Sequence, residues 1–192
     1  AIARCTGTAD VVAAVDVARE HDLLLSVKSG GHHVSGTAVC DDGLVVDLSP
    51  MDGVRVDPDA RTVRVQAGAT WGDVDHETQA FGLAVPGGQD PNIGVAGLTL
   101  GGGVGWLSRK YGLTCDNLLS ADVVTADGGL VHANADENPD LFWALRGGGG
   151  NFGVVTAFEF GLHELEPTVL AGPIVYDFAD APEVMAAVTD AL

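Results

Sequence analysis

The sequence predicts an α+β fold built as two lobes. Apolar runs of strand length and amphipathic helical stretches occur in both halves of the chain. Val54–Val56 and Thr62–Gln66 flank the turn sequence Asp57-Pro-Asp-Ala60, which indicates an antiparallel hairpin. The 27 glycines cluster at a few places between the expected elements, which is typical of close backbone approach and not of a flexible linker.

The first lobe is expected over residues 1–67. Thr8 can N-cap a helix that continues to about His21 and buries one apolar face, formed by Val11, Ala14, Val15 and Ala18. The apolar run Leu23–Val27 predicts a buried strand, and Leu44–Leu48 predicts another. The hairpin completes this lobe.

The segment Lys28-Ser29-Gly30-Gly31-His32-His33 follows the expected strand and is the centre of the prediction. Two adjacent glycines allow a sharp turn, in which successive backbone N–H groups can converge on a phosphate. A histidine beside this turn can reach whatever the phosphate carries. Metal binding, a catalytic base and ordinary loop histidines remain open from the residues alone, although adjacent residues rarely chelate one ion.

The second lobe is expected over residues 68–163. Thr70 can cap a helix from Trp71 to about Phe81, which Gly82 ends. Residues 94–106 hold too many glycines for a stable isolated helix, so a helix there needs support, for which a bound ligand would serve. Asp127-Gly128 predicts a turn between strands 118–126 and 130–133, Asn138-Pro139 begins a short helix to about Leu145, and residues 152–160 form a strand.

Residues 164–192 are expected to begin a substrate domain that is otherwise absent. Asp180 can cap a helix in which Val184, Ala187, Val188 and Ala191 share one face. Either this face belongs to a longer protein, or the helix folds back on the second lobe.

The composition is strongly acidic, with a formal net charge of -18 and only Lys28 and Lys110 as lysines. Such a surface disfavours nucleic-acid binding, which needs a basic patch, and no apolar run approaches the length of a membrane span. The scarcity of lysine favours a halophilic protein over a merely acidic mesophilic one. Cys5, Cys40 and Cys115 show no disulfide or metal spacing, so they are predicted to be buried reduced thiols in a cytoplasmic protein.

Three further patterns are interpreted conservatively. Gly148-x-Gly150-x-x-Gly153 matches the dinucleotide fingerprint by letter, but a helix precedes it and a strand follows, the reverse of a Rossmann site. Ser29 lacks the Gly-x-Ser-x-Gly context of a hydrolase. The three tryptophans, Trp71, Trp106 and Trp143, are expected in the core or beside a ligand.

Taken in order, several motifs resemble one family. They include Lys28–His32, Val63–Gly72, Gly82–Gly88, Gly94–Gly97, Gly101–Gly105, Lys110–Leu113, Asp116–Leu118, Asn138–Arg146 and Asn151–Val155. Over about residues 2–165 the chain is similar to the PCMH-type FAD-binding domain of berberine-bridge-enzyme-like and 6-hydroxynicotine-oxidase-like flavoproteins, in the vanillyl-alcohol-oxidase group.

The resemblance implies two lobes with FAD extended between them. It implies that Ser29, Gly30, Gly31 and His33 hold the diphosphate and that His32 is joined to the flavin 8α position, so that FAD can be covalent. Val155 would meet the adenine end through its backbone, and Gly153 would also contact the cofactor. The remaining cofactor contacts are glycines, namely Gly88, Gly94, Gly97, Gly102, Gly103 and Gly105.

Two departures from the family pattern matter. Many relatives carry a cysteine that forms a second flavin bond, where this chain has Asp90. The family's catalytic base lies beyond this chain, so no catalytic residue is assigned. Ile93 stands at a position that influences oxygen access and leaves oxidase or dehydrogenase chemistry open.

The function implied is the FAD-binding part of an FAD-linked oxidoreductase. A C–H bond of an alcohol, sugar or amine would pass a hydride to flavin N5, and O₂ or another acceptor would reoxidise the flavin. The alternative is a flavin-binding module or fragment without its own turnover. No metal, nucleic acid or membrane partner is expected.

The acidic surface leads to a prediction about salt. Screening shortens the range of like-charge repulsion from about 10 Å at 0.1 M salt to about 3 Å at 1 M. We therefore expect the free energy of unfolding to rise as sodium chloride is added, measured by chemical denaturation. A chain fully stable in dilute buffer, with no gain from salt, would contradict the halophilic interpretation.

Overall fold

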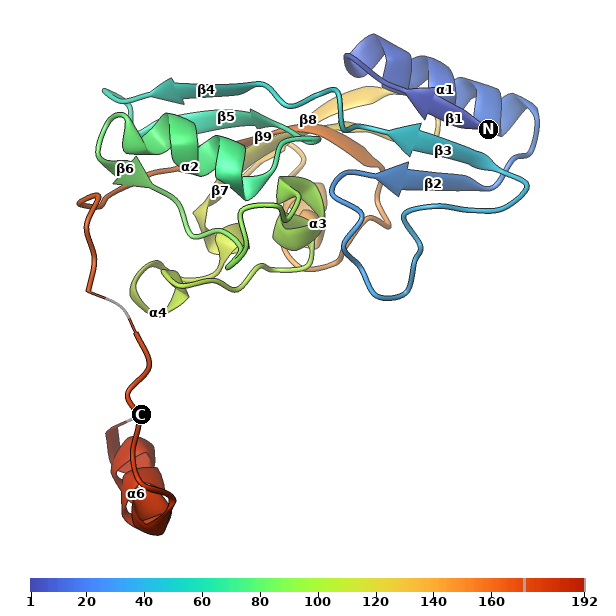
Figure 1. The fold of residues 1–192 in the computed structure, drawn as a ribbon. Coiled ribbons are helices and arrows are strands. Elements are labelled where there is room, and N and C mark those ends of the chain that lie inside the picture. Colours follow the sequence, from blue (N-terminus) through green and yellow to red (C-terminus); the bar gives the residue numbers. More distant parts are fainter. Residues whose placement is uncertain (171, 192) are drawn as a thin grey trace.

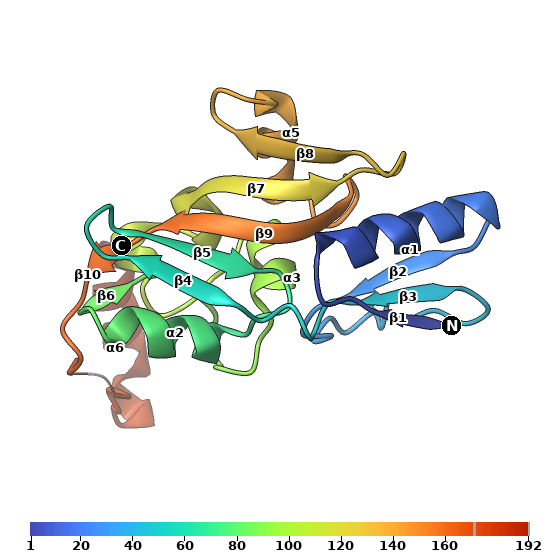
Figure 2. The same cartoon turned by 90° about the horizontal axis from the view of Figure 1, so that it is seen from above.

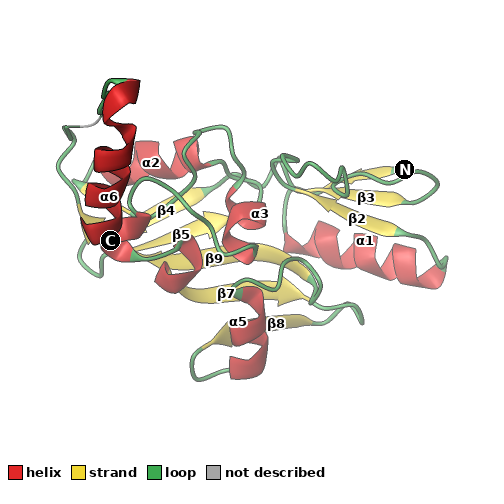
Figure 3. Ribbon diagram, turned by 90° about the horizontal axis from the view of Figure 1, so that it is seen from below, coloured by secondary structure: helices red, strands yellow, loops and turns green. Residues whose placement is uncertain are grey.

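The structure is a computed structural model that describes residues 1–170 and 172–191. A small parallel sheet and a larger antiparallel sheet lie side by side, and α2 and α3 cover one face of the larger sheet (Figures 1 and 3). A short pair, β6 (Leu83–Ala84) and β10 (His163–Glu164), joins the end of the second half to the loop after α2. This mixed architecture confirms the α+β prediction.

The small sheet has the order β1 (Ile2–Arg4), β3 (Leu44–Asp47), β2 (Leu25–Lys28). All four residues of β3 are buried because a strand pairs with it on each side. The strand predicted over Leu23–Val27 is present, but it is shifted and is not buried along its length. β2 is an edge strand that begins at Leu25, and Leu24 before it is 64% exposed.

Helix α1 (Thr8–Glu20) buries the predicted face and packs against strands of both sheets. Its N-terminus differs from the prediction, because Gly7 and not Thr8 is the N-cap and no side chain caps the helix. Instead, the backbone N–H and the hydroxyl of Thr6 both donate to the Asp10 carboxylate at 2.8 Å. These hydrogen bonds from Thr6 lower the pKa of Asp10.

The larger sheet has the order β4 (Val54–Asp57), β5 (Thr62–Gln66), β9 (Val154–Gly161), β7 (Leu118–Val124), β8 (Leu130–Asn134). Both expected hairpins, β4–β5 and β7–β8, are confirmed. However, the β4–β5 hairpin belongs to this sheet and not to the small sheet. The boundary between the two sheets therefore lies before Val54, whereas the first lobe was expected to extend to residue 67. The reason is the pairing of β5 with β9, which buries the alternating Val63 and Val65 opposite Phe160 and Phe158.

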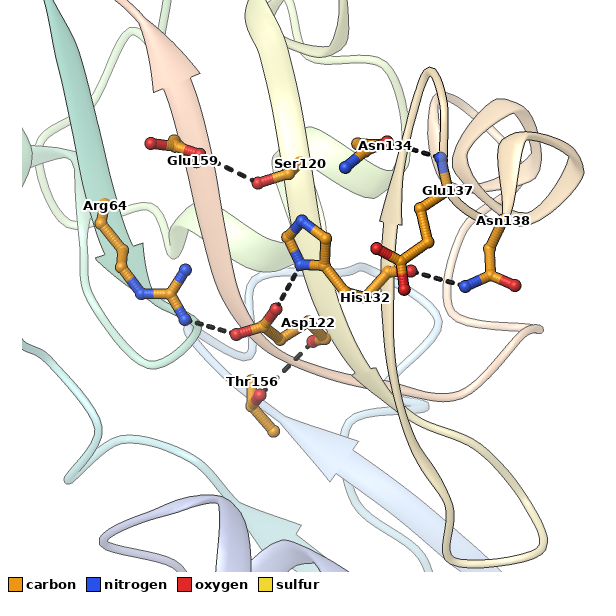
Figure 4. A network of polar contacts seen from close by, with 9 residues as sticks. All are labelled: Arg64, Ser120, Asp122, His132, Asn134, Glu137, Asn138, Thr156 and Glu159. Carbon is orange, nitrogen blue, oxygen red and sulfur yellow. Dashed lines mark hydrogen bonds and ion pairs between the residues drawn. The ribbon is translucent and has the colours of Figure 1, made fainter. Parts of the chain in front are cut away.

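The other face of the larger sheet is polar and is seen from above in Figure 2. Here Asp122 accepts hydrogen bonds from Arg64 and from His132, whose Nδ1 lies 2.7 Å from a carboxylate oxygen, and Ser120 donates to Glu159 at 3.1 Å (Figure 4). Burial raises the pKa of Asp122, but the hydrogen bonds from His132 and Arg64 outweigh it and leave the pKa below its usual range. These contacts involve four strands of the sheet, β5, β9, β7 and β8, and are separate from the glycine-rich loops.

The second half also contains α2 (Trp71–Gln79), α3 (Val95–Leu100), α4 (Ser108–Tyr111), η1 (Thr114–Asn117) and α5 (Pro139–Leu145). Helix α2 begins with a capping box in which Thr70 and Asp73 exchange hydrogen bonds, as predicted for Thr70. Trp71 is fully buried, whereas Trp106 and Trp143 are 79% and 75% exposed. The latter two therefore do not lie in the core, and a position beside a ligand stays a prediction for them.

The C-terminal elements are η2 (Phe178–Asp180) and α6 (Ala181–Ala191). The expected helix is present, but none of its residues is buried, and it stands apart from both sheets (Figure 1). The alternative in which it folds back on the second lobe is therefore not observed.

The three cysteines carry free thiols. Cys5 and Cys115 are buried as predicted, and burial raises the pKa of each thiol. Cys40 is only partly buried, in contrast to the prediction. Among the described residues, no helix has both the length and the apolar character needed to span a membrane.

The two threonines at helix starts provide a test of the fold. Thr70→Ala removes a capping box and should lower the free energy of unfolding by about 1 kcal/mol. Thr8→Ala is the matched control, because α1 has no side-chain cap, and it should change stability much less. Chemical denaturation of both variants measures the difference, and equal losses would contradict the assigned caps.

Candidate functional site

The loop after β2 carries most of the predicted site residues and is anchored at its start. The Ser29 hydroxyl donates to the carbonyl of Ala67 at 2.7 Å, which ties the loop to the segment between β5 and α2. Gly31 has φ +73°, a left-handed conformation that glycine adopts without steric cost. Residues 30–37 are all exposed, so the loop presents its backbone to solvent.

Gly30 and Gly94 lie in direct backbone contact. A Cβ added to Gly30 would lie 2.6 Å from the Gly94 nitrogen, and one added to Gly94 would lie 2.5 Å from the Gly30 nitrogen. Both distances are shorter than any real Cβ contact, so only glycine at both positions permits this approach. The contact brings the Gly-Gly-His loop against the start of α3. Both segments carry residues that are predicted to bind the cofactor.

Helix α3 is held by packing and by the neighbouring backbone. Val95 donates to the Ala69 carbonyl at 2.9 Å, and Thr70 and Gly94 form a β-bridge. Four of the six residues of α3 are buried, namely Val95, Ala96, Thr99 and Leu100. Burial therefore supplies the support that the glycine-rich helix was expected to need. Gly97 lies on the exposed side, where an added Cβ would meet nothing within 4 Å.

The backbone N–H groups of residues 30–33 have no hydrogen-bond acceptor among the residues that the structure describes. Unpaired N–H groups on an exposed turn are suited to an anion, because they carry partial positive charge and can exchange a water molecule for a phosphate oxygen as the acceptor. The nearby ammonium of Lys28 is already paired with Asp47, at 3.2 Å. Backbone groups are therefore the main donors that the loop offers.

The two histidines are oriented differently. Nε2 of His32 lies 3.1 Å from the carbonyl oxygen of Asn92. Nδ1 of His33 accepts from the backbone N–H of Ser35 at 3.2 Å and lies 2.6 Å from its hydroxyl, so His33 is bound within its own loop. His32 instead joins this loop to residues 90–93, where Asn92 donates twice to Asp90, and these bonds lower the pKa of Asp90.

The remaining glycines contact other parts of the same region. A Cβ on Gly105 would lie 1.7 Å from the Gly87 carbonyl oxygen, and one on Gly88 would lie 3.2 Å from both Trp71 and Ile93. Gly102 and Gly103 have φ of +105° and +83°, and their carbonyls accept from Cys115 and Thr114. These contacts surround α3 and its two flanking loops.

Gly153 and Val155 lie at the start of β9. Gly153 has φ +139°, and a Cβ there would lie 2.6 Å from the Val124 carbonyl oxygen. Val155 is buried opposite Val123 of β7, so only its backbone could reach a ligand. The loop before β9 contacts the other end of α3, because Gly149 donates to the Leu100 carbonyl at 2.9 Å.

Sequence reasoning missed two contributors, the carbonyls of Ala67 and Asn92, which hold Ser29 and His32. Backbone groups leave no residue-type signal, although Asp90-Pro-Asn92 is a recognisable turn sequence. Two surface hollows lie away from the predicted residues. One lies beside Gly82 and Glu164, and the other lies beside Asp52 and His76.

The two site types that the sequence disfavours are a Rossmann fingerprint and a metal site. Gly148–Gly153 lies between α5 and β9, so these glycines do not open a helix as a Rossmann fingerprint does. Within residues 1–170 and 172–191, no group of three or more histidine, cysteine, aspartate or glutamate side chains could hold a metal ion.

Comparison with known proteins gives consistent matches. Residues 1–134 match the model of a family described as FAD binding domain. (R)-6-hydroxynicotine oxidase of Paenarthrobacter nicotinovorans is 46% identical over 175 residues, which cover 91% of this chain and 38% of the relative. The crystal structure of 6-hydroxy-D-nicotine oxidase from Arthrobacter nicotinovorans matches with a TM-score of 0.91 at 42% identity, covering 99% of this chain and 42% of that chain.

A third match concerns glucooligosaccharide oxidase from Acremonium strictum, which carries 6-S-cysteinyl, 8α-N1-histidyl FAD. It matches with a TM-score of 0.80 at 38% identity, covering 86% of this chain and 35% of that chain. The chain therefore spans less than half the length of the relatives it matches.

The Gly30–Gly94 contact can be tested by adding one methyl group. Gly30→Ala forces its Cβ into the Gly94 backbone and should lower the free energy of unfolding by about 1–3 kcal/mol. Gly97→Ala, on the open side of α3, should be neutral or stabilise by up to about 1 kcal/mol. Chemical denaturation compares the two variants, and a Gly30→Ala chain as stable as the wild type would contradict the contact.

Proposed function

Because this chain belongs to the PCMH-type FAD-binding domain family of FAD-linked oxidoreductases, we propose that it is the flavin-binding part of an enzyme that oxidises a C–H bond. The substrate class is an alcohol, a sugar or an amine. Since the chain spans 38% of the length of its oxidase relative, the activity of the whole protein is part of this proposal.

The observation that carries the proposal is the exposed turn at Gly30-Gly31, packed against Gly94. Its four successive N–H groups, those of residues 30–33, have no acceptor in the described part of the chain. Such a turn suits the diphosphate of FAD, because two negative phosphates can each accept from more than one amide. Aspartate and glutamate outnumber lysine and arginine by 27 to 9, so binding by backbone groups is the route that the composition leaves open.

We propose roles for the predicted residues on this basis. Ser29, Gly30, Gly31 and His33 hold the diphosphate, and His32 is the attachment residue for the flavin. Val155 contacts the adenine end through its backbone, and Gly153 also contacts the cofactor. The glycines that allow close approach of the cofactor are Gly88, Gly94, Gly97, Gly102, Gly103 and Gly105. The cradle requires glycine at both Gly30 and Gly94, because a Cβ at either position would collide with the backbone of the other.

When bound, FAD supplies a hydride acceptor at N5, and dioxygen or another acceptor removes the electrons afterwards. The residues of this chain bind the cofactor and set its position, and no catalytic residue is assigned among them. Ile93 is partly buried beside Gly88. On the basis of the family resemblance, we propose that this side chain influences access of dioxygen, which leaves oxidase or dehydrogenase chemistry open.

A single covalent link is the strongest attachment available to this chain. Glucooligosaccharide oxidase has a cysteinyl and a histidyl bond, whereas here Asp90 replaces the second attachment residue. Cys5, Cys40 and Cys115 all lie outside the segment 88–93. We propose that flavin is joined through His32 alone.

We also propose that the protein works in a salt-rich, reducing cytoplasm. The net charge of -18 supports a salt-rich environment, and the three free thiols support a reducing one.

The attachment is tested with FAD and acid precipitation. Flavin should stay in the acid pellet of the wild type, whereas His32→Ala should lose essentially all of its acid-stable flavin and keep noncovalent FAD, because the backbone cradle remains. His76→Ala, an exposed histidine of α2, is the matched control and should behave as the wild type. Absorbance of pellet and supernatant measures both fractions.

The outcomes separate the candidate functions. Flavin that washes out of the wild type on acid treatment would overturn the covalent link. A chain that does not bind FAD at all would overturn the proposed function. A flavinylated protein that no alcohol, sugar or amine reduces would favour a flavin-binding module without turnover.

A further inference from the structure

The turn at Asp90–Ile93 holds the carbonyl group that contacts His32. Oδ1 of Asp90 accepts from the backbone N–H of Asn92 at 2.8 Å and from its side-chain amide at 2.9 Å. Ile93 donates to the Asp90 carbonyl at 3.1 Å, which closes the turn. One carboxylate oxygen therefore fixes both the backbone and the side chain of Asn92.

The same turn is fastened to the first residues of α2. Gly72 donates to the Pro91 carbonyl at 2.8 Å, and Trp71 donates to the Ile93 carbonyl at 3.0 Å. The amides at a helix start lack partners within the helix, so they are free to bind this turn. The carbonyls on both sides of Asn92 are thereby held, and the Asn92 carbonyl is left to His32.

This arrangement decides which nitrogen of His32 carries the proton. A carbonyl oxygen only accepts hydrogen bonds, so the contact of 3.1 Å requires a proton on Nε2. In the neutral imidazole, Nδ1 then has the free lone pair. A bond to carbon can form only at the nitrogen that has a lone pair, so the turn selects the reactive atom.

We propose that Asp90 is a positioning residue for flavin attachment. Its carboxylate shapes the turn whose Asn92 carbonyl keeps the His32 proton on Nε2 and directs Nδ1 toward the flavin. This inference rests on the proposed function, and it gives a role to the residue that replaces the second attachment cysteine. Asp90 itself forms no bond to the cofactor.

The attachment step balances with dioxygen as the oxidant. A bond forms between Nδ1 and the flavin 8α carbon, and one C–H bond of that carbon breaks. The carbon and the imidazole each release one proton, and the electron pair enters the flavin ring. Dioxygen takes up the two electrons and two protons as hydrogen peroxide, which leaves oxidised, histidyl-linked flavin.

The test uses the chain prepared without flavin. ¹⁵N NMR of histidine-labelled protein, assigned by comparison with His32→Ala, reports which ring nitrogen of His32 is protonated. FAD is then added in air, and acid-stable flavin is followed with time. Asp90→Asn keeps an acceptor oxygen for the turn, Asp90→Ala removes it, and Asp57→Ala removes a similar contact, to Ala60 at 2.9 Å, in the β4–β5 turn.

We expect the Nε2-protonated form in the wild type, in Asp90→Asn and in Asp57→Ala, and a mixture of tautomers in Asp90→Ala. Attachment should be at least about 10-fold slower in Asp90→Ala and within about 3-fold of the wild type in Asp90→Asn, with unchanged noncovalent affinity for FAD. A near-wild-type attachment rate in Asp90→Asn would show that Asp90 acts by holding the turn that positions His32, and not through its negative charge.

The inference is overturned if the His32 proton lies on Nδ1 in the wild type, or if Asp90→Ala attaches flavin at the wild-type rate. The NMR result on the wild type needs only the His32→Ala comparison and no flavin, so it decides the orientation even if Asp90→Ala does not fold. If the wild type shows the expected tautomer but binds no FAD, the proposed function fails and the inference about attachment fails with it. Tautomer and binding are measured separately, so the two failures are distinguishable.

Discussion

The close approach of Gly30 to Gly94 is the constraint on which the candidate site depends. It joins the loop after β2 of the small sheet to the start of α3, which packs under the larger sheet. A side chain at either position would separate the two segments. Because the segments are more than sixty residues apart in the chain, this one contact brings the unpaired amides, His32 and the turn at Asp90 into one region.

Much of the site consists of backbone groups, and this agrees with the charge of the chain. A protein with a net charge of -18 has few cations to offer an anionic cofactor, and Lys28 is already engaged by Asp47. Peptide N–H groups bind anions through partial charges that do not depend on composition. Gly30, Gly94 and Gly105 allow backbone to come close to backbone in this region.

The two sheets have different roles in this arrangement. The larger sheet buries alternating valines and phenylalanines on one face and carries the Arg64–Asp122–His132 network on the other. It supports α2 and α3 rigidly, because both helices pack against the apolar face. The small sheet supplies β2, an edge strand that ends directly at the exposed loop. A functional loop on a rigid support is a common arrangement for binding sites.

The sequence by itself determined the local elements, because their signals are local. The Thr70 capping box, the two hairpins and the buried face of α1 follow from residue type and spacing within a few positions. Family motifs likewise identified the cofactor class. The tertiary structure decided the rest. Burial of Val63 and Val65 against β9 moved the first hairpin into the larger sheet, and edge pairing exposed Leu24. The bond from His32 to the Asn92 carbonyl depends on packing between distant segments, and a carbonyl that every residue carries gives no sign of it in the sequence.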